Sequence, residues 1–248
     1  MVLLYGEASR AQVIRSETFS VDSSRPVATA LLELTNRHPG ILTYEDPPYA
    51  YSGDIQDATL QVRGRQAQGA EGRVLVPQGG RIFGQYDVYV GTGRIVDGRR
   101  VVERIVQFNN RNDLGGHFRL IGGPEALHVV PLEARDANGE WNALGSILDV
   151  NISISTGVME GGALLHEILK ETAAVSGTNI FGASYERFNN AFARFEGEID
   201  VKDTPARDVL KSLLQEISER FTWHLNFDPG GQYYIFAVHS AAEPPLGN

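Results

Sequence analysis

One helix-like stretch carries residues of the types that bind zinc. His166-Glu167 with Glu171 is similar to the pattern H-E-x-x-H, but Lys170 stands where the second histidine is required. Because a metal site needs at least two ligands facing one way, we interpret these residues as a solvated helix face. We therefore predict no metal site and no bound metal cofactor.

Other catalytic patterns are also incomplete. His224 alternates with Asn226 and Asp228, which predicts a polar sheet surface rather than a catalytic group. Gly91-Thr-Gly93 is only a fragment of a nucleotide-binding motif, and the sequence has neither a G-x-x-x-x-G-K phosphate loop nor a G-x-S-x-G elbow. We predict no catalytic and no cofactor-binding residues. The alternative is a hydrolase whose acids are scattered in sequence and gathered by the fold.

The arginines are the most unusual feature of the chain. Residues 60–112 hold nine arginines and four acids, a local charge of +5, whereas the rest of the chain carries 13 basic and 27 acidic residues, or −14. Arginine offers a planar fork that suits carboxylates and phosphates. The candidate partner-binding residues are Arg94, Arg99, Arg100 and Arg104. Two interpretations stay open: a site for an acidic partner or polyanion, or a charged edge that prevents stray strand pairing.

Composition excludes several classes of protein. A net charge of −9 disfavours a nucleic-acid partner for the surface as a whole, and the absence of cysteine excludes disulfides and thiolate metal sites. No apolar run reaches the ~18–20 residues of a membrane span. A chain of 248 residues is long enough to bury a core without such cross-links.

The clearest structural pattern lies at residues 198–238. A strand at 198–202 precedes a helix that Thr204 and Pro205 would start, with a stripe of leucines and isoleucine at 210, 213, 214 and 217. An aromatic strand at 221–228 and a hairpin partner at 233–238 follow. The helix stripe and the aromatic strand face need each other, because neither can bury its apolar side alone.

A weaker copy of this pattern opens the chain. A strand from Phe19 precedes a helix that starts at Ser24-Arg25-Pro26, and Ile41–Glu45 forms the next strand. Asp46-Pro47 closes this unit as Asp228-Pro229 closes the later one, which indicates an internal repeat of a βαβ-type unit.

The region between the two copies is predicted to be rich in strands. We expect strands at 73–76, 81–90 and 99–108, with Asp97-Gly98 as a hairpin turn. A further strand at 147–155 precedes a helix that begins after Gly161-Gly162 and ends at Gly177. The predicted fold class is α+β, with two small βαβ-type modules at 13–150 and 151–240. The first contains a β-rich hairpin insertion at about 52–116, and 1–12 and 241–248 are tails.

The run GEIDVKDTPARDVLKSLL, with the aromatic strand and YYIFAV after it, resembles the short N-terminal (STN-type) modules of secretins and TonB-dependent receptors. Residues 162–238 match that outline, and FSVDSSRPVATALLELTNRHPGILTYED resembles the opening half of another copy. The Arg-rich insertion and the absence of a following barrel or ring domain depart from the family. The resemblance implies a non-catalytic bacterial envelope protein that binds a protein partner or itself.

The N-terminus bears on the compartment. Residues 1–11 are open to two interpretations, a frayed end or the remnant of a signal peptide that ends at Ser9-Arg10-Ala11. With the family resemblance, the second predicts a periplasmic or secreted protein whose upstream signal is missing. The alternative is a cytoplasmic protein.

Overall fold

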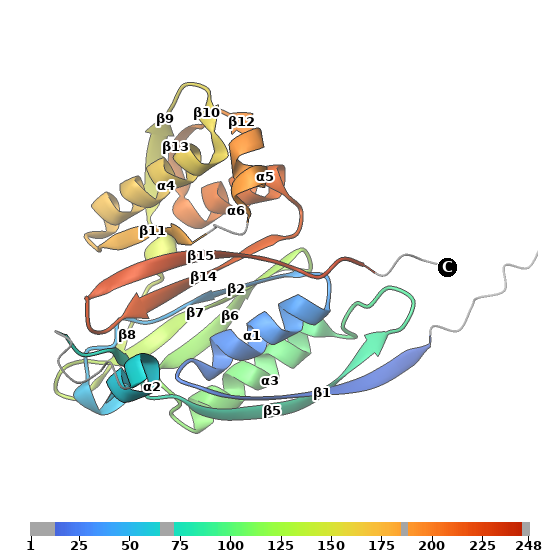
Figure 1. The fold of residues 1–248 in the computed structure, drawn as a ribbon, viewed down its shortest axis with the longest axis vertical. Helices are drawn as coiled ribbons and strands as arrows, with labels where there is room; N and C mark the ends of the chain where they lie inside the picture. The colour runs from blue at the N-terminus through green and yellow to red at the C-terminus, as the bar shows by residue number, and fades with distance from the viewer. Residues whose placement is uncertain (1–12, 65–71, 185–187, 245–248) are drawn as a thin grey trace, which may run out of the picture.

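A computed structural model describes residues 13–64, 72–184 and 188–244. Its centre is a seven-stranded mixed sheet in the order β11-β15-β14-β2-β7-β6, with β8 also paired to β7 (Figure 1). The strands are β2 (Ile41–Glu45), β6 (His117–Gly122), β7 (Ala126–Arg135), β8 (Trp141–Ala143), β11 (Ile180–Ser184), β14 (Phe221–Asp228) and β15 (Tyr233–Ser240). The combination of this sheet with packed helices confirms the predicted α+β class.

Two pairs of helices cover opposite faces of the sheet (Figure 1). On one face lie α1 (Pro26–Arg37) and α3 (Gly98–Arg111), and on the other lie α4 (Gly161–Ser176) and α6 (Ala206–Ile217). Each pair buries its own apolar cluster against the sheet, one built around Leu31 and Val129 and the other around Leu210 and Trp223. Such layering follows because each helix has only one apolar stripe to bury.

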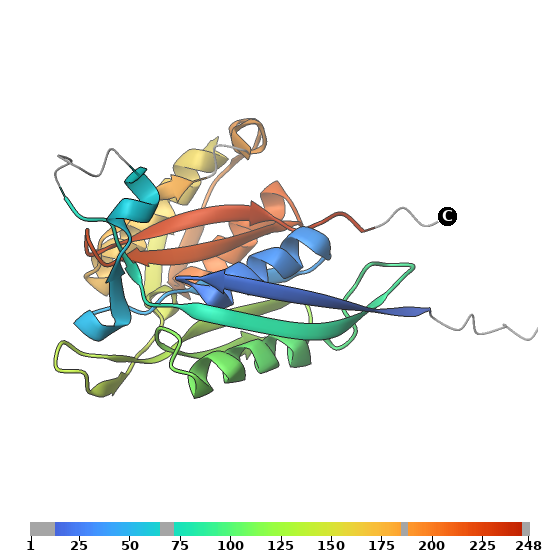
Figure 2. The same ribbon diagram turned by 60° about the horizontal axis from the view of Figure 1, so that its bottom comes forward.

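Antiparallel ribbons complete the structure. β1 (Ile14–Ser23) pairs with β5 (Gly80–Tyr89) along its whole length and runs beside α1 and α3 (Figure 2). β9 (Asn151–Ser155) pairs with β13 (Asp200–Pro205); β9 contacts α4, and β13 contacts α6. The smaller elements are η1 (Ser52–Asp54), β3 (Ile55–Asp57), α2 (Thr59–Arg63), β4 (Leu75–Pro77), η3 (Ile147–Asp149), β10 (Met159–Glu160), α5 (Asn189–Arg194) and β12 (Glu196–Gly197).

The two similar units meet in the middle of the sheet. β2 and β14 follow α1 and α6 respectively, and they lie side by side and parallel, with Tyr44 opposite His224. Strands from residues 13–150 therefore occupy one side of this β2–β14 junction, and strands from 151–240 occupy the other. The predicted leucine stripe of α6 and the apolar face of β14 are both buried in one cluster, as expected.

The predicted strand at 99–108 is wrong, because this segment is the helix α3. Asp97 has a positive φ of 51°, as the expected hairpin turn requires, but its carboxylate accepts a hydrogen bond from the Arg100 N–H and caps a helix. The valines and isoleucines that suggested a strand include Val101, Val102, Ile105 and Val106. In the structure, these four side chains form one buried helical stripe. The predicted insertion therefore contributes a core helix as well as the strand β5.

Two local predictions also need correction. Thr204 does not cap α6: its hydroxyl donates to the Lys202 carbonyl, and Pro205 occupies the position before the first helical residue. The strand expected at 147–155 begins only at Asn151, because 147–149 form a 3₁₀ turn, in which the Leu148 N–H donates to the Ser146 hydroxyl. No helix in the described ranges is long and apolar enough to cross a membrane.

Candidate functional site

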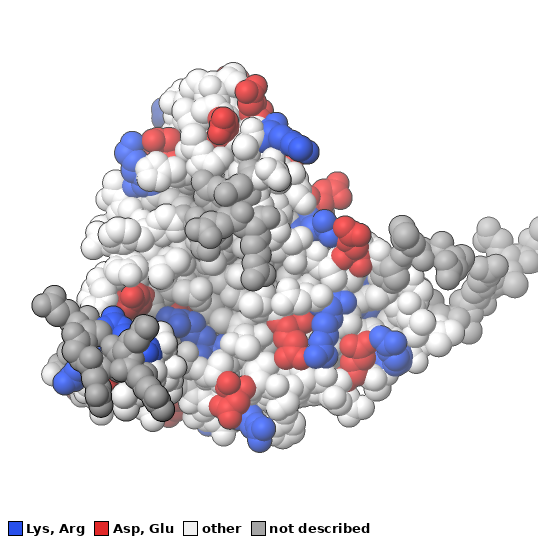
Figure 3. Space-filling model, in the orientation of Figure 1, with Lys and Arg blue, Asp and Glu red and all other residues white. Residues whose placement is uncertain are grey.

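The four candidate arginines do not form one surface. Arg94 and Arg99 line a pocket between α1 and α3, whereas Arg100 and Arg104 line an open groove on another side of α3. The cause is the helix itself, since a residue and its immediate neighbour point about 100° apart around the axis. Basic and acidic side chains are also interspersed over the face seen in Figure 3, so the charge split along the sequence produces no single-signed patch there.

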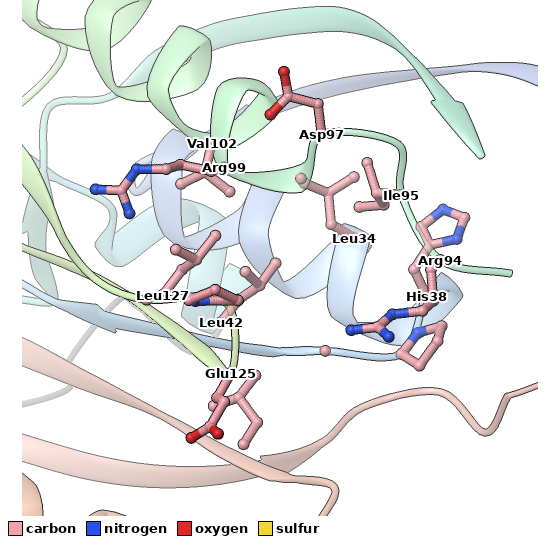
Figure 4. Close-up of a pocket in the computed structure, with 16 residues that line it drawn as sticks. Leu34, His38, Leu42, Arg94, Ile95, Asp97, Arg99, Val102, Glu125 and Leu127 are labelled. Carbon is pink, nitrogen blue, oxygen red and sulfur yellow. The ribbon is translucent and has the colours of Figure 1, made fainter. Parts of the chain in front are cut away.

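The pocket between α1 and α3, here called the α1–α3 pocket, has a volume of about 340 Å³. It opens where the end of α1, the start of α3 and the β6–β7 turn come together (Figure 4). Its walls are largely apolar, and the apolar side chains that line it include Leu34, Ile41, Leu42, Ile95, Val102 and Leu127. This size lies at the lower end of the range for small-molecule sites.

Charged side chains surround the mouth of this pocket. Arg94 extends across it from the loop before α3, while the Asp97 carboxylate points away toward the helix that it caps (Figure 4). Arg99 is held by Glu103 at 3.0 Å and donates to the Gly122 carbonyl at 3.0 Å. Glu125 stands on the opposite side. Of the two arginines at this mouth, Arg94 is therefore the one whose guanidinium makes no ion pair within the described ranges.

A buried histidine fixes the loop that carries Arg94. The His38 Nδ1–H donates to the Gly93 carbonyl at 2.9 Å, and its Nε2 lies 2.8 Å from the Tyr86 hydroxyl. The Tyr89 N–H also donates to the Arg94 carbonyl at 2.9 Å. These bonds join the end of α1 to the loop, so the pocket mouth is formed by the fold itself.

A second surface lies on the far side of α3. Phe83 of β5 is 69% exposed, and its ring meets that of Phe108 edge-on at 6.0 Å. Arg104 lines the same hollow of about 230 Å³. Arg100 and Arg104 also line the neighbouring groove of about 510 Å³. We call Phe83, Phe108, Arg100 and Arg104 the α3–β5 surface.

The fold does bring acids together, at the β2–β14 junction. Glu45 is buried and forms an ion pair with the buried Arg207 of α6. Arg207 also donates to Ser146 at 2.7 Å and to Asp149 at 2.8 Å, and the Ser146 hydroxyl donates to Glu45. Burial raises the pKa of Glu45, and the neighbouring Arg207 opposes that rise. The carboxylate is thus committed to a structural ion pair.

The adjacent Asp46 is equally occupied. Its carboxylate accepts from the Arg25 Nε–H at 2.6 Å and from the Phe227 N–H at 2.8 Å. The hydroxyls of Tyr44 and Tyr49 donate to its other oxygen at 2.6 Å and 3.0 Å. Glu45 and Asp46 both line a pocket of about 300 Å³, but their carboxylate oxygens are already engaged in these ion pairs and hydrogen bonds.

The predicted exposure of His224 is wrong, whereas that of His166 is right. His166 lies on the exposed face of α4, next to the Glu167–Lys170 ion pair. His224 is only 3% exposed, and its ring contacts those of Tyr44 and His239. Burial, with a smaller effect of His239, lowers the pKa of His224 to about 3. Among the described residues, no group of three or more His, Cys, Asp or Glu side chains is placed to hold a metal ion.

Acid is expected to destabilise the protein through His224. Because the folded state holds its pKa near 3 and the unfolded state near 6.5, the stability is complete above pH 6.5 and declines as the pH falls toward 3. Between pH 6.5 and 5 this one group costs about 1.5 kcal/mol. In urea unfolding series, the free energy of unfolding of His224→Leu should fall by about 1.5 kcal/mol less than that of the wild type between pH 6.5 and pH 5. His166→Gln, the exposed control, should follow the wild type, and identical slopes for all three proteins would contradict the prediction.

Comparisons with family models, curated proteins and solved structures found no match to this chain. The resemblance to STN-type modules therefore stays a prediction. The signal-peptide interpretation concerns residues 1–11, which lie outside the described residues.

Proposed function

We propose that this protein is a non-catalytic interaction module of the bacterial envelope that binds an acidic partner protein through the α3–β5 surface. The observation that carries the proposal is Phe83, a large aromatic side chain that is 69% exposed beside Phe108 and two arginines. Aromatic residues and arginine are the types that supply most of the binding energy at protein interfaces.

The chemistry of this surface favours an acidic segment with an apolar anchor. An inserted apolar side chain would cover the Phe83–Phe108 pair and displace water from the hollow beside it. The groove next to it is lined by Arg100 and Arg104, whose planar guanidinium groups suit carboxylates. Asp87 and Asp97 also line this groove, where they accept hydrogen bonds from Ser16 and from the Arg100 N–H respectively. A non-catalytic role also agrees with the acids at the β2–β14 junction, which are used in ion pairs and hydrogen bonds.

Site-specific cross-linking tests this proposal. A photoreactive benzoylphenylalanine is placed at Phe83 in the native host, and at Leu60, which is 74% exposed on α2, as the control. We expect position 83 to capture one defined protein in the periplasmic fraction, with the cross-linked peptide lying in an acidic segment. A synthetic copy of that segment should bind the purified protein, and its binding should weaken as salt is raised.

Charge reversal provides the decisive variant. Arg100→Glu with Arg104→Glu should abolish both the cross-link and the peptide binding, while a variant with Arg111→Glu retains them. Equal capture from positions 83 and 60, a captured segment without acidic residues, or binding that survives the double reversal would each overturn the proposal.

A further inference from the structure

We propose that the α1–α3 pocket is a separate binding site for a small amphipathic carboxylate, a molecule with an unbranched alkyl chain and one anionic head. The site goes beyond the proposed function, because it uses different residues on a different side of α3. Its lining joins an apolar wall to two arginines at the mouth, of which Arg99 is paired with Glu103 and Arg94 makes no ion pair within the described ranges. These features determine the class of ligand.

The apolar wall selects the alkyl part. Leu34 and Val102 are 1% exposed and Leu127 is 9% exposed, so the wall belongs to the rigid core rather than to mobile surface side chains. Leu42 and Ile95 are partly buried and complete the lining toward the mouth. A chain inserted here would exchange contact with water for contact with these side chains, with little rearrangement of the protein.

The charged side chains at the mouth of the α1–α3 pocket determine the charge of the ligand's head group. Arg94 makes no side-chain ion pair with any residue in the described ranges, whereas Arg99 is engaged by Glu103 and the Gly122 carbonyl. The acid on the opposite side, Glu125, has a side chain that is 85% exposed and lies 3.8 Å from the Lys211 ammonium. The charge available to a ligand head is therefore the positive charge of Arg94, and a carboxylate matches its two-pronged geometry.

Hydrogen bonds fix the position of the loop that carries Arg94 before a ligand binds. His38 ties Gly93 to the end of α1, and the Val96 N–H donates to the Asp87 carbonyl at 2.7 Å. Arg94 lies between these two fastened points. Its backbone therefore loses little conformational entropy when a ligand binds, and this small loss favours binding.

Isothermal titration calorimetry with decanoate, octanoate and decanol tests the site, each ligand being used below its aggregation concentration. The proteins are the wild type, Arg94→Gln, the control Arg111→Gln and Leu42→Trp, which fills the pocket. We expect saturable binding of decanoate, about tenfold weaker binding of octanoate and weaker binding of decanol. Arg94→Gln should weaken decanoate binding at least about tenfold, whereas Arg111→Gln should not change it.

The outcomes separate this site from the α3–β5 surface. Leu42→Trp should abolish decanoate binding at an unchanged melting temperature, and the Arg100→Glu, Arg104→Glu double variant should bind decanoate like the wild type. Absence of saturable decanoate binding overturns the proposal. Equal affinities for decanoate in the wild type and Arg94→Gln also overturn it, and this test holds whether or not Leu42→Trp folds, because Arg94 is an exposed side chain.

Discussion

Replacing Leu213 by aspartate is expected to lower the free energy of unfolding by more than about 4 kcal/mol. Leu213 lies on the inner stripe of α6, is 5% exposed, and belongs to the cluster around Trp223. The aspartate would remove a packed aliphatic side chain and place a carboxylate among the apolar side chains of this cluster. A carboxylate in such surroundings is either an unpaired charge or must take up a proton, and both cost free energy.

The neighbouring residue provides a matched control. Ser212→Asp introduces the same carboxylate one position earlier on α6, where the side chain is exposed. Its free energy of unfolding should stay within about 0.5 kcal/mol of the wild type. Urea unfolding followed by circular dichroism measures both variants. Equal midpoints for Leu213→Asp and the wild type would show that this face of α6 does not pack against the sheet.

Replacing Arg207 by methionine is expected to destabilise the protein by about 3–5 kcal/mol at pH 7.5. The variant keeps much of the side-chain volume but leaves the buried Glu45 carboxylate without its cation. Asp149 also loses two hydrogen bonds, but its side chain is 41% exposed and water replaces the lost contacts. Most of the effect therefore comes from Glu45.

The pH dependence of this variant identifies the cause. Without Arg207 the folded-state pKa of Glu45 rises further above its ordinary value, because burial remains and the opposing cation is gone. A raised carboxyl pKa gives stability that is present at low pH and is lost as the pH rises through the folded-state pKa. The difference between Arg207→Met and the wild type should therefore shrink from pH 8 to pH 5.

A double variant completes this test. Glu45→Gln with Arg207→Met removes the charge as well as its partner, so it should be more stable than Arg207→Met alone at pH 7.5. Unfolding curves at three pH values measure all of these differences. A pH-independent loss in Arg207→Met, with no recovery in the double variant, would show that packing rather than charge stabilises the junction.

Local sequence patterns predicted most of the helices and strands on either side of the β2–β14 junction. The leucine stripe of α6 and the alternating aromatics of β14 follow periods that a short window of sequence displays in full. The same holds for α1 and β2. Helix α1 begins with Pro26 at its first position, as predicted. In these segments, the residues that make the structure lie within a few positions of each other.

The errors arose where one pattern fits two structures. Residues 98–108 are rich in valine and isoleucine, which favour strands, and Asp97-Gly98 is typical of a tight hairpin turn. The segment is a helix because β5, β6 and α1 supply the apolar surface against which Val101, Val102, Ile105 and Val106 pack. Its helical period was visible in the sequence, whereas the contact with α1, which lies far away in the chain, was not.

The sequence by itself determined the fold class, the amphipathic helices α1, α4 and α6 and the lack of a recognisable catalytic motif, because these depend on composition and short-range spacing. Only the tertiary structure decided that β2 and β14 lie side by side and that Glu45 and Arg207 meet there, 162 residues apart. It also decided that Arg94 and Arg99 open onto one pocket while Arg100 and Arg104 lie elsewhere. Such contacts depend on how separate elements pack, and no local pattern of residues specifies that packing.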